Sequence, residues 1–126
     1  MTGPGNAAPA GTGLAPNIAA ALSYLFGIIS GVVFFVIEKN NPFVRFHAMQ
    51  SILVSAVFIA LSIAFSIIAI FPVIGWLFAI LGHLVLGLVG LVLWLVLMFK
   101  AFSGEEWEVP IIGKYARQYA NTGTTI

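Results

Sequence analysis

Three long apolar stretches, separated by short polar segments, dominate the pattern of hydrophobic and polar positions along the chain. They cover about residues 17–37, 43–71 and 74–99. The first stretch, as a helix rising about 1.5 Å per residue, would be about 31 Å long, close to the hydrocarbon core of a bilayer. The other two form a run too long for one helix, and Pro72 and Gly75 interrupt it. The pattern predicts an all-α membrane protein with three transmembrane helices.

The ends of the chain follow different patterns. Residues 1–16 are mostly Gly, Ala, Pro, Thr and Asn with almost no bulky apolar side chain, so we expect a disordered N-terminal tail. Near the other end, Ile111, Tyr115 and Tyr119 would share one side of a short helix, which suits a helix lying in the membrane interface. Residues 17–119 are thus predicted to form one three-span membrane domain with an interfacial tail helix, followed by a flexible C-terminus at residues 120–126.

Small residues recur on one face of each predicted span. Such faces let helix backbones approach closely, which is how helices associate in lipid. We therefore interpret them as candidate helix-packing positions. They are Gly27, Gly31, Ser51, Ser55, Gly82 and Gly90.

Composition supports a membrane location. Of 126 residues 61% are hydrophobic and 7% charged, whereas a soluble domain is typically about a quarter charged. The net charge of +1 gives no reason to expect a nucleic-acid partner. The lipid bilayer is the expected partner, and a homo-oligomer or a second membrane protein is left open.

Charge also predicts an orientation for the three-span arrangement. All five Lys and Arg residues lie in the loop after the first stretch, at the start of the second helix, or from Lys100 onwards. With three spans these positions share one side of the membrane. The positive-inside rule then predicts a multi-pass protein of the cytoplasmic membrane, with its N-terminus outside and its C-terminus in the cytoplasm.

The sequence contains no recognisable catalytic or metal-binding constellation. It has two His, no Cys and no Asp, which leaves too few ligands for a metal site and no aspartate to orient a catalytic histidine. Its glycines lie in apolar stretches rather than in phosphate-binding turns. We expect no enzyme activity and no cofactor.

His83 is the one ionisable residue predicted to lie near the middle of the bilayer. A group at that depth suggests a function such as proton transfer. A proton pathway would normally need a carboxylate partner, and no predicted span contains one. We therefore favour a neutral imidazole that is hydrogen-bonded to a nearby serine or to a backbone carbonyl.

The second apolar stretch begins with a polar cluster. Asn41 and Pro42 are typical of a helix N-cap and first helical residue. We predict that the residues after them fasten the loop and the second helix to the C-terminal tail, with Arg45 facing a lipid phosphate or a tail carboxylate. The members of this predicted interfacial staple are Arg45, His47, Gln50, Glu105, Glu106 and Trp107.

Two motifs carry a resemblance to a known family. They are the helix entry with Pro42, Phe43, Arg45, His47, Ala48 and Gln50, and the tail with Gly104, Glu105, Trp107 and Pro110. Over about residues 17–119 the chain resembles a family of small uncharacterised prokaryotic membrane proteins, distantly related to a chloroplast inner-envelope protein-import component. The resemblance implies a multi-pass membrane protein and no established activity.

Two functions remain as hypotheses. The first is a structural or interaction protein, an accessory subunit that acts through helix packing. The alternative is a small transporter or oligomeric pore, linked to protein import by the distant resemblance. A polar path through the bilayer would favour the second, and the only candidate is the weakly polar series of Ser51, Ser55, Ser62 and Ser66 with His83.

Overall fold

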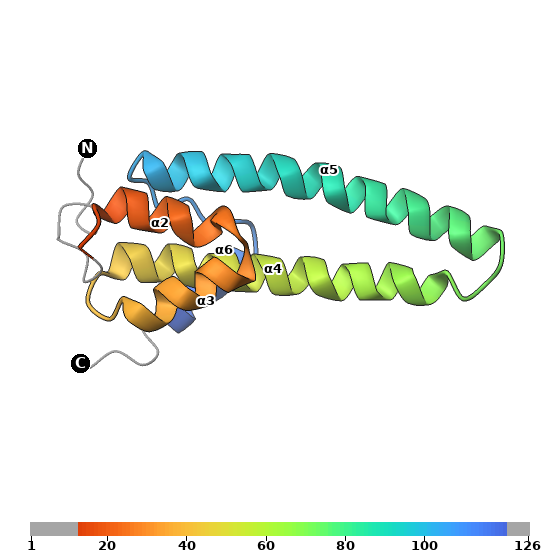
Figure 1. Cartoon of the computed structure of the whole chain (residues 1–126), viewed down its shortest axis with the longest axis horizontal. Helices are drawn as coiled ribbons and strands as arrows, with labels where there is room; N and C mark the ends of the chain where they lie inside the picture. Colours follow the sequence, from red (N-terminus) through yellow and green to blue (C-terminus); the bar gives the residue numbers. More distant parts are fainter. Residues whose placement is uncertain (1–12, 121–126) are drawn as a thin grey trace.

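The structure, a computed structural model, describes residues 13–120, and its regular elements are all helices (Figure 1). In that range it contains five helices and no strand, which confirms the predicted all-α class. The expected disordered and flexible ends fall largely outside the described residues, at 1–12 and 121–126. The helices are α2 (Pro16–Leu25), α3 (Ile28–Ile37), α4 (Pro42–Ile68), α5 (Ile74–Phe102) and α6 (Ile112–Ala120).

Helices α4 and α5 form a long antiparallel hairpin (Figure 1). Helix α4 starts as expected, because Oδ1 of Asn41 accepts a hydrogen bond from the Val44 N–H at 3.2 Å. The predicted turn is also present and is very tight. A Cβ on Gly75 would lie 2.1 Å from the Ile68 carbonyl oxygen, so only glycine fits there. Within residues 13–120 these two helices are the ones long and apolar enough to cross a membrane.

The predicted first span is wrong. Residues 17–37 do not form one helix; they fold into α2 and α3, each ten residues long. Gly27 joins them with φ 61° and ψ −127°, a backbone conformation that glycine adopts readily and other residues rarely. The two helices run back alongside each other (Figure 1). The chain therefore has two candidate spans rather than three, within the residues described.

The start of α2 and the end of α5 lie at the same end of the molecule (Figure 1). Nδ2 of Asn17 donates a hydrogen bond to the Phe102 carbonyl at 2.9 Å, across 85 positions in the sequence. Our prediction of opposite sides for the two termini rested on an odd number of spans, and the two-span fold removes that basis.

Helices α2, α3 and α6 surround only one half of the hairpin (Figure 1). We call this half the head: residues 13–55 and 90–120. The other half, residues 56–89, is the arm, which consists of the far parts of α4 and α5 and the turn between them. All fully buried large side chains of the described chain belong to the head, and the side chains of the arm are mostly exposed.

Candidate functional site

A polar network lies buried in the head, at the start of α4. Gln50 is fully buried and uses both ends of its amide. Its Nε2 donates to the hydroxyl of Tyr24 at 2.9 Å and to the Trp107 carbonyl at 3.0 Å, and its Oε1 accepts from the Val109 N–H at 2.9 Å. One side chain thereby joins α2, α4 and the segment that leads to α6. Nothing in this amide is left unpaired, which is the condition for burying it.

His47 continues the network one turn earlier. Its Nε2 lies 2.8 Å from the Glu105 carbonyl oxygen and its Nδ1 lies 2.6 Å from the Tyr24 hydroxyl. A carbonyl can only accept, so Nε2 carries a proton and donates it. The Tyr24 oxygen already accepts from Gln50, so its own O–H is free to donate to Nδ1. A neutral His47 with its proton on Nε2 satisfies all of these groups.

Arg45 holds the ends of two other helices. Its Nη1 donates to the carbonyls of Phe35 and Glu38, at 2.8 and 2.6 Å, and its Nε donates to the Ala120 carbonyl at 2.7 Å. These carbonyls belong to the C-terminal ends of α3 and α6, where backbone oxygens lack helical partners and a cation is favoured. The side chain is 1% exposed, so we correct our placement of it against lipid phosphate.

The tail carboxylates pair with Arg117 and Lys100, whereas Arg45 was the expected partner. Arg117 of α6 donates through Nη1 to Glu106 at 2.6 Å and through Nε to Glu108 at 2.5 Å. Lys100 pairs with Glu105 at 3.2 Å. Partial burial alone would lower the pKa of Arg117, but the hydrogen bonds to the two carboxylates outweigh it and raise the pKa. These pairs are largely exposed, so each is typically worth at most about 1 kcal/mol.

All six predicted staple residues lie in the head, and three residues that sequence reasoning missed also belong to its hydrogen-bond network. Tyr24 links His47 to Gln50. The buried Glu38 accepts from the N–H groups of Asn40 and Asn41, at 3.1 and 3.0 Å. Trp94 donates its indole N–H to the Tyr24 carbonyl at 2.8 Å. For Tyr24 and Trp94 the available signal was a polar atom in an apolar helix, since such an atom must find a partner in lipid.

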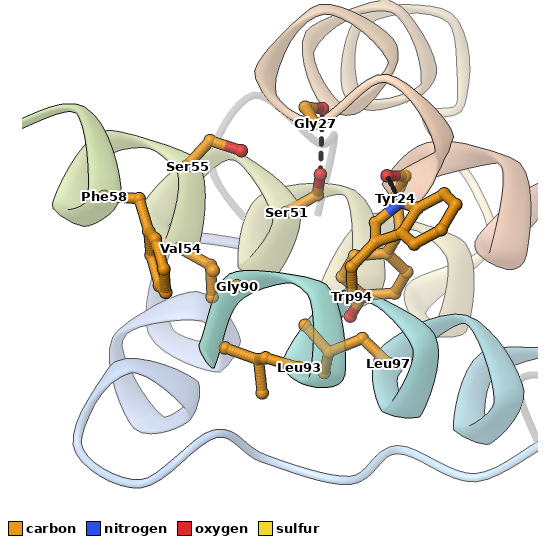
Figure 2. A pocket seen from close by; sticks show the side chains of 10 residues that line it. All are labelled: Tyr24, Gly27, Ser51, Val54, Ser55, Phe58, Gly90, Leu93, Trp94 and Leu97. Atoms are coloured by element: carbon orange, nitrogen blue, oxygen red, sulfur yellow. Dashed lines mark hydrogen bonds between the residues drawn. The ribbon is translucent and has the colours of Figure 1, made fainter. Parts of the chain in front are cut away.

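The predicted helix-packing residues lie in two groups. Gly31 packs closely on α4, because a Cβ there would lie 3.0 Å from the Ala48 carbonyl oxygen. Gly82 faces the ring of Phe65, with only 2.3 Å between an added Cβ and the ring. Gly27, Ser51, Ser55 and Gly90 instead line a cavity of about 150 Å³ between the α2–α3 turn, α4 and α5 (Figure 2).

The cavity is mainly apolar. Its other lining residues are Tyr24, Val54, Phe58, Leu93, Trp94 and Leu97. The Ser51 hydroxyl donates to the Gly27 carbonyl at 2.9 Å, as the dashed line in Figure 2 shows, so it supports the turn. Across residues 13–120 no three His, Cys, Asp or Glu side chains gather closely enough to hold a metal ion.

His83 lies apart from this network, in the arm. Its Nδ1 is 2.7 Å from the Ala79 carbonyl, one turn earlier in α5, and its Nε2 is 3.5 Å from the Ser66 hydroxyl. The Ser66 hydroxyl donates to the Ser62 carbonyl at 2.8 Å. The Ala79 carbonyl is the kind of backbone partner expected for His83. The Ser66 hydroxyl uses its proton on Ser62, so it has none left to donate to Nε2. Ser62 and Ser66 stay in the arm, so they do not continue the serine pair of the cavity as a buried path.

The chain is similar to known proteins along most of its length. Residues 12–116 match the model of the magnetosome magnetite crystal formation protein family. A UPF0132 membrane protein of Methanocaldococcus jannaschii is 44% identical over 108 residues, which cover 86% of this chain and 91% of that protein. A UPF0132 membrane protein of Archaeoglobus fulgidus is 45% identical over 102 residues, covering 81% and 92%. No solved structure matches the chain.

Proposed function

Because the chain belongs to the magnetosome magnetite crystal formation protein family, and its archaeal relatives are named membrane proteins, we propose that it is a structural or interaction protein of the cytoplasmic membrane. In this proposal it is an accessory subunit. The head fixes the geometry of the hairpin, and the arm offers its apolar surface to the helices of another membrane protein or of a second copy.

The observation that carries the proposal is the contrast between the two halves. The polar groups of the head are buried and paired, whereas the arm exposes large apolar side chains on both helices; Ile63, Leu84 and Leu88 are each more than half exposed. A surface of this kind needs lipid or protein around it. Small residues next to it, such as the open Gly87, allow another helix backbone to approach.

For the orientation we propose that both ends of the chain lie in the cytoplasm. Support comes from the basic residues, which all belong to the head: Lys39, Arg45, Lys100, Lys114 and Arg117. The arm contains none of them. With two spans the positive-inside rule puts the head, and both termini with it, on the cytoplasmic side.

A photoreactive amino acid placed at Leu84 tests the packing role in native membranes. We expect a covalent adduct with a protein of defined mass, because the Leu84 side chain faces outward from the arm. The same amino acid at Tyr119, which is exposed on the head, serves as the matched control. Adducts with lipid alone at Leu84 and at neighbouring arm positions would contradict the proposal.

A small transporter or oligomeric pore remains the second candidate, and one observation favours it. The α2–α3 turn interrupts an apolar segment beside a cavity that two serines line, and interrupted helices often form binding sites in transporters. The protein-import connection from the distant resemblance belongs to this candidate. Solute or ion flux in proteoliposomes that is lost when Ser55 is replaced by Leu would favour transport over a packing role.

A further inference from the structure

The two halves of the molecule differ in width. Helices α2 and α3 lie beside α4 and α5 in the head, and only α4 and α5 continue into the arm (Figure 1). A helix is about 10 Å across, so the two additional helices add on the order of 160 Å² to the cross-section of the head. The cross-section of the molecule is therefore about twice as large at one end as at the other, before α6 is counted.

The step in width falls near the middle of a bilayer. Each of α2 and α3 has ten residues, so each is about 15 Å long, half of a hydrocarbon core of about 30 Å. The turn at Gly27 lies beside Ser51 of α4, and Trp94 of α5 reaches the same turn. Beyond that level residues 56–68 of α4 extend for about another 20 Å. The head thus matches one leaflet and the arm matches the other.

The outer surface of the short hairpin is suited to hydrocarbon. Helix α3 exposes Ile29, Val32, Val33 and Val36, and Phe26 at the turn is 70% exposed. A helix pair with this surface would not be stable in the aqueous phase. The additional helices of the head therefore occupy area inside a leaflet.

The width of the head is held by hydrogen bonds. The Ser30 hydroxyl donates to the Ser23 carbonyl at 2.9 Å and accepts from the Phe26 N–H at 3.0 Å. Ser51 and Trp94 pair with the carbonyls of Gly27 and Tyr24. A chain reversal inside hydrocarbon is stable only when such partners satisfy its backbone. These side chains fix α2 and α3 in place, so lipid pressure does not simply push them aside.

We infer from this shape that the protein is a membrane-bending wedge, which prefers and stabilises bilayers that are convex on the side of the head. In a flat bilayer the arm occupies less area in its leaflet than the head occupies in the opposite leaflet. Lipid must fill the difference. Bilayers adapt to such mismatched inclusions at an energetic cost, and curvature towards the head relieves it. Bending of this kind requires no protein partner, so it goes beyond the packing role and is tested separately.

The test uses the full-length protein with an epitope fused to its C-terminus. It is reconstituted into vesicles of phosphatidylcholine and phosphatidylglycerol that are extruded to a series of diameters. External protease reports the fraction of molecules whose head faces outward. The outer leaflet is the convex one, so the ratio of outward-facing to inward-facing molecules should rise severalfold from the largest to the smallest vesicles. A fraction that does not change with diameter would overturn the wedge.

Two glycine variants separate the shape of the head from other causes. Gly27→Leu removes the residue on which the turn depends and should let α2 and α3 join into one span. An epitope added at the N-terminus then reports this change, because it would lie on the other side of the membrane from the C-terminus. When α2 and α3 form one span, the orientation of the head should no longer depend on vesicle diameter. A dependence that persists would contradict the wedge. Gly87→Leu, at an arm position with open space around it, should keep the dependence. If Gly87→Leu abolished the dependence on vesicle diameter as completely as Gly27→Leu, the shape of the head would be ruled out as its cause.

Discussion

The hydroxyl of Tyr24 and Nδ1 of His47 are 2.6 Å apart, inside a region where both side chains are almost completely buried. The same hydroxyl accepts a hydrogen bond from Gln50, so a single phenol connects α2 to two polar residues of α4. Each partner depends on it, because all three side chains are at most 2% exposed. The stability of the head should therefore be sensitive to this one oxygen atom.

Tyr24→Phe tests that dependence. The substitution removes the hydroxyl but keeps the ring, so Nδ1 of His47 and one N–H of Gln50 lose their partner. A buried polar group without a partner costs about 1–3 kcal/mol, and we expect a loss in that range from thermal unfolding in detergent. Tyr119→Phe, at an exposed position of α6, is the matched control and should change little. Equal stability of both variants would contradict the assigned hydrogen bonds.

Arg45 is expected to control the docking of α6. Arg45→Ala leaves the carbonyls of Phe35, Glu38 and Ala120 without this donor, and loss of a buried charged donor costs about 3 kcal/mol or more. Proteolysis of the tail should accelerate, with little change in membrane insertion. Arg45→Lys should recover only part of the protection, because an ammonium lacks the planar fork of a guanidinium.

Arg117→Ala serves as the comparison for Arg45. It removes the ion pairs with Glu106 and Glu108, which are largely exposed, so we expect a cost of at most about 1 kcal/mol. The tail should then remain nearly as resistant to protease as in the wild type. A larger effect from Arg117→Ala than from Arg45→Ala would reverse the order of importance derived from burial.

The contact between Gly82 and Phe65 should determine how closely the two helices of the arm approach. Gly82→Leu forces the Phe65 ring out of its place, since even a Cβ would lie within 2.4 Å of two ring atoms. We expect lower thermal stability in detergent, and partial recovery when Phe65→Ala is combined with it. Gly87→Leu has no such neighbour and should be tolerated. Additive effects of Gly82→Leu and Phe65→Ala would show that the two residues are not coupled.

The positions of the two termini can be tested directly. A reporter that is active only in the cytoplasm should be active when fused to either end of the chain, because two spans return the chain to the side where it started. The proposal fails if a well-expressed N-terminal fusion is silent while the C-terminal fusion is active. That result would match the three-span arrangement, which the structure does not have.

The sequence predicted the long helices well because their signals are local. Asn41 caps α4 as expected, and Pro72 and Gly75 mark the turn before α5. A short tail helix was also anticipated from the spacing of its rings, and its place in the membrane interface stays a prediction. In each case the residues that determine the helix or turn lie within a few sequence positions of it, so the local sequence is enough to predict it.

The span at residues 17–37 was predicted wrongly because the fold of this segment depends on distant partners. Residues 17–37 have the length and composition of a span, and Gly27 was interpreted as a packing residue although glycine also commonly ends helices. Whether this segment forms one span or two short helices depends on the groups that pair with the interrupted backbone. Two of them, Ser51 and Trp94, lie 24 and 70 positions away from the residues they serve.

The partner of Arg45 was missed for a similar reason. Its position at the start of α4 and the nearby tail carboxylates favoured an ion pair, which is a short-range expectation about charge. Instead the guanidinium reaches the last carbonyls of α3 and α6, which only the assembled head brings together. The carboxylates Glu106 and Glu108 pair with Arg117, 11 and 9 positions along the chain.

The bond from Trp94 to the Tyr24 carbonyl has a consequence for biosynthesis. A ribosome completes residues 13–37 well before it adds Trp94, so the turn at Gly27 enters the membrane without one of its donors. The Tyr24 carbonyl also accepts from the Gly27 N–H at 3.2 Å, so the turn has a local partner before α5 is made. The bond from Trp94 can form only once α5 is present, so the path of residues 16–37 is completed by a residue made much later.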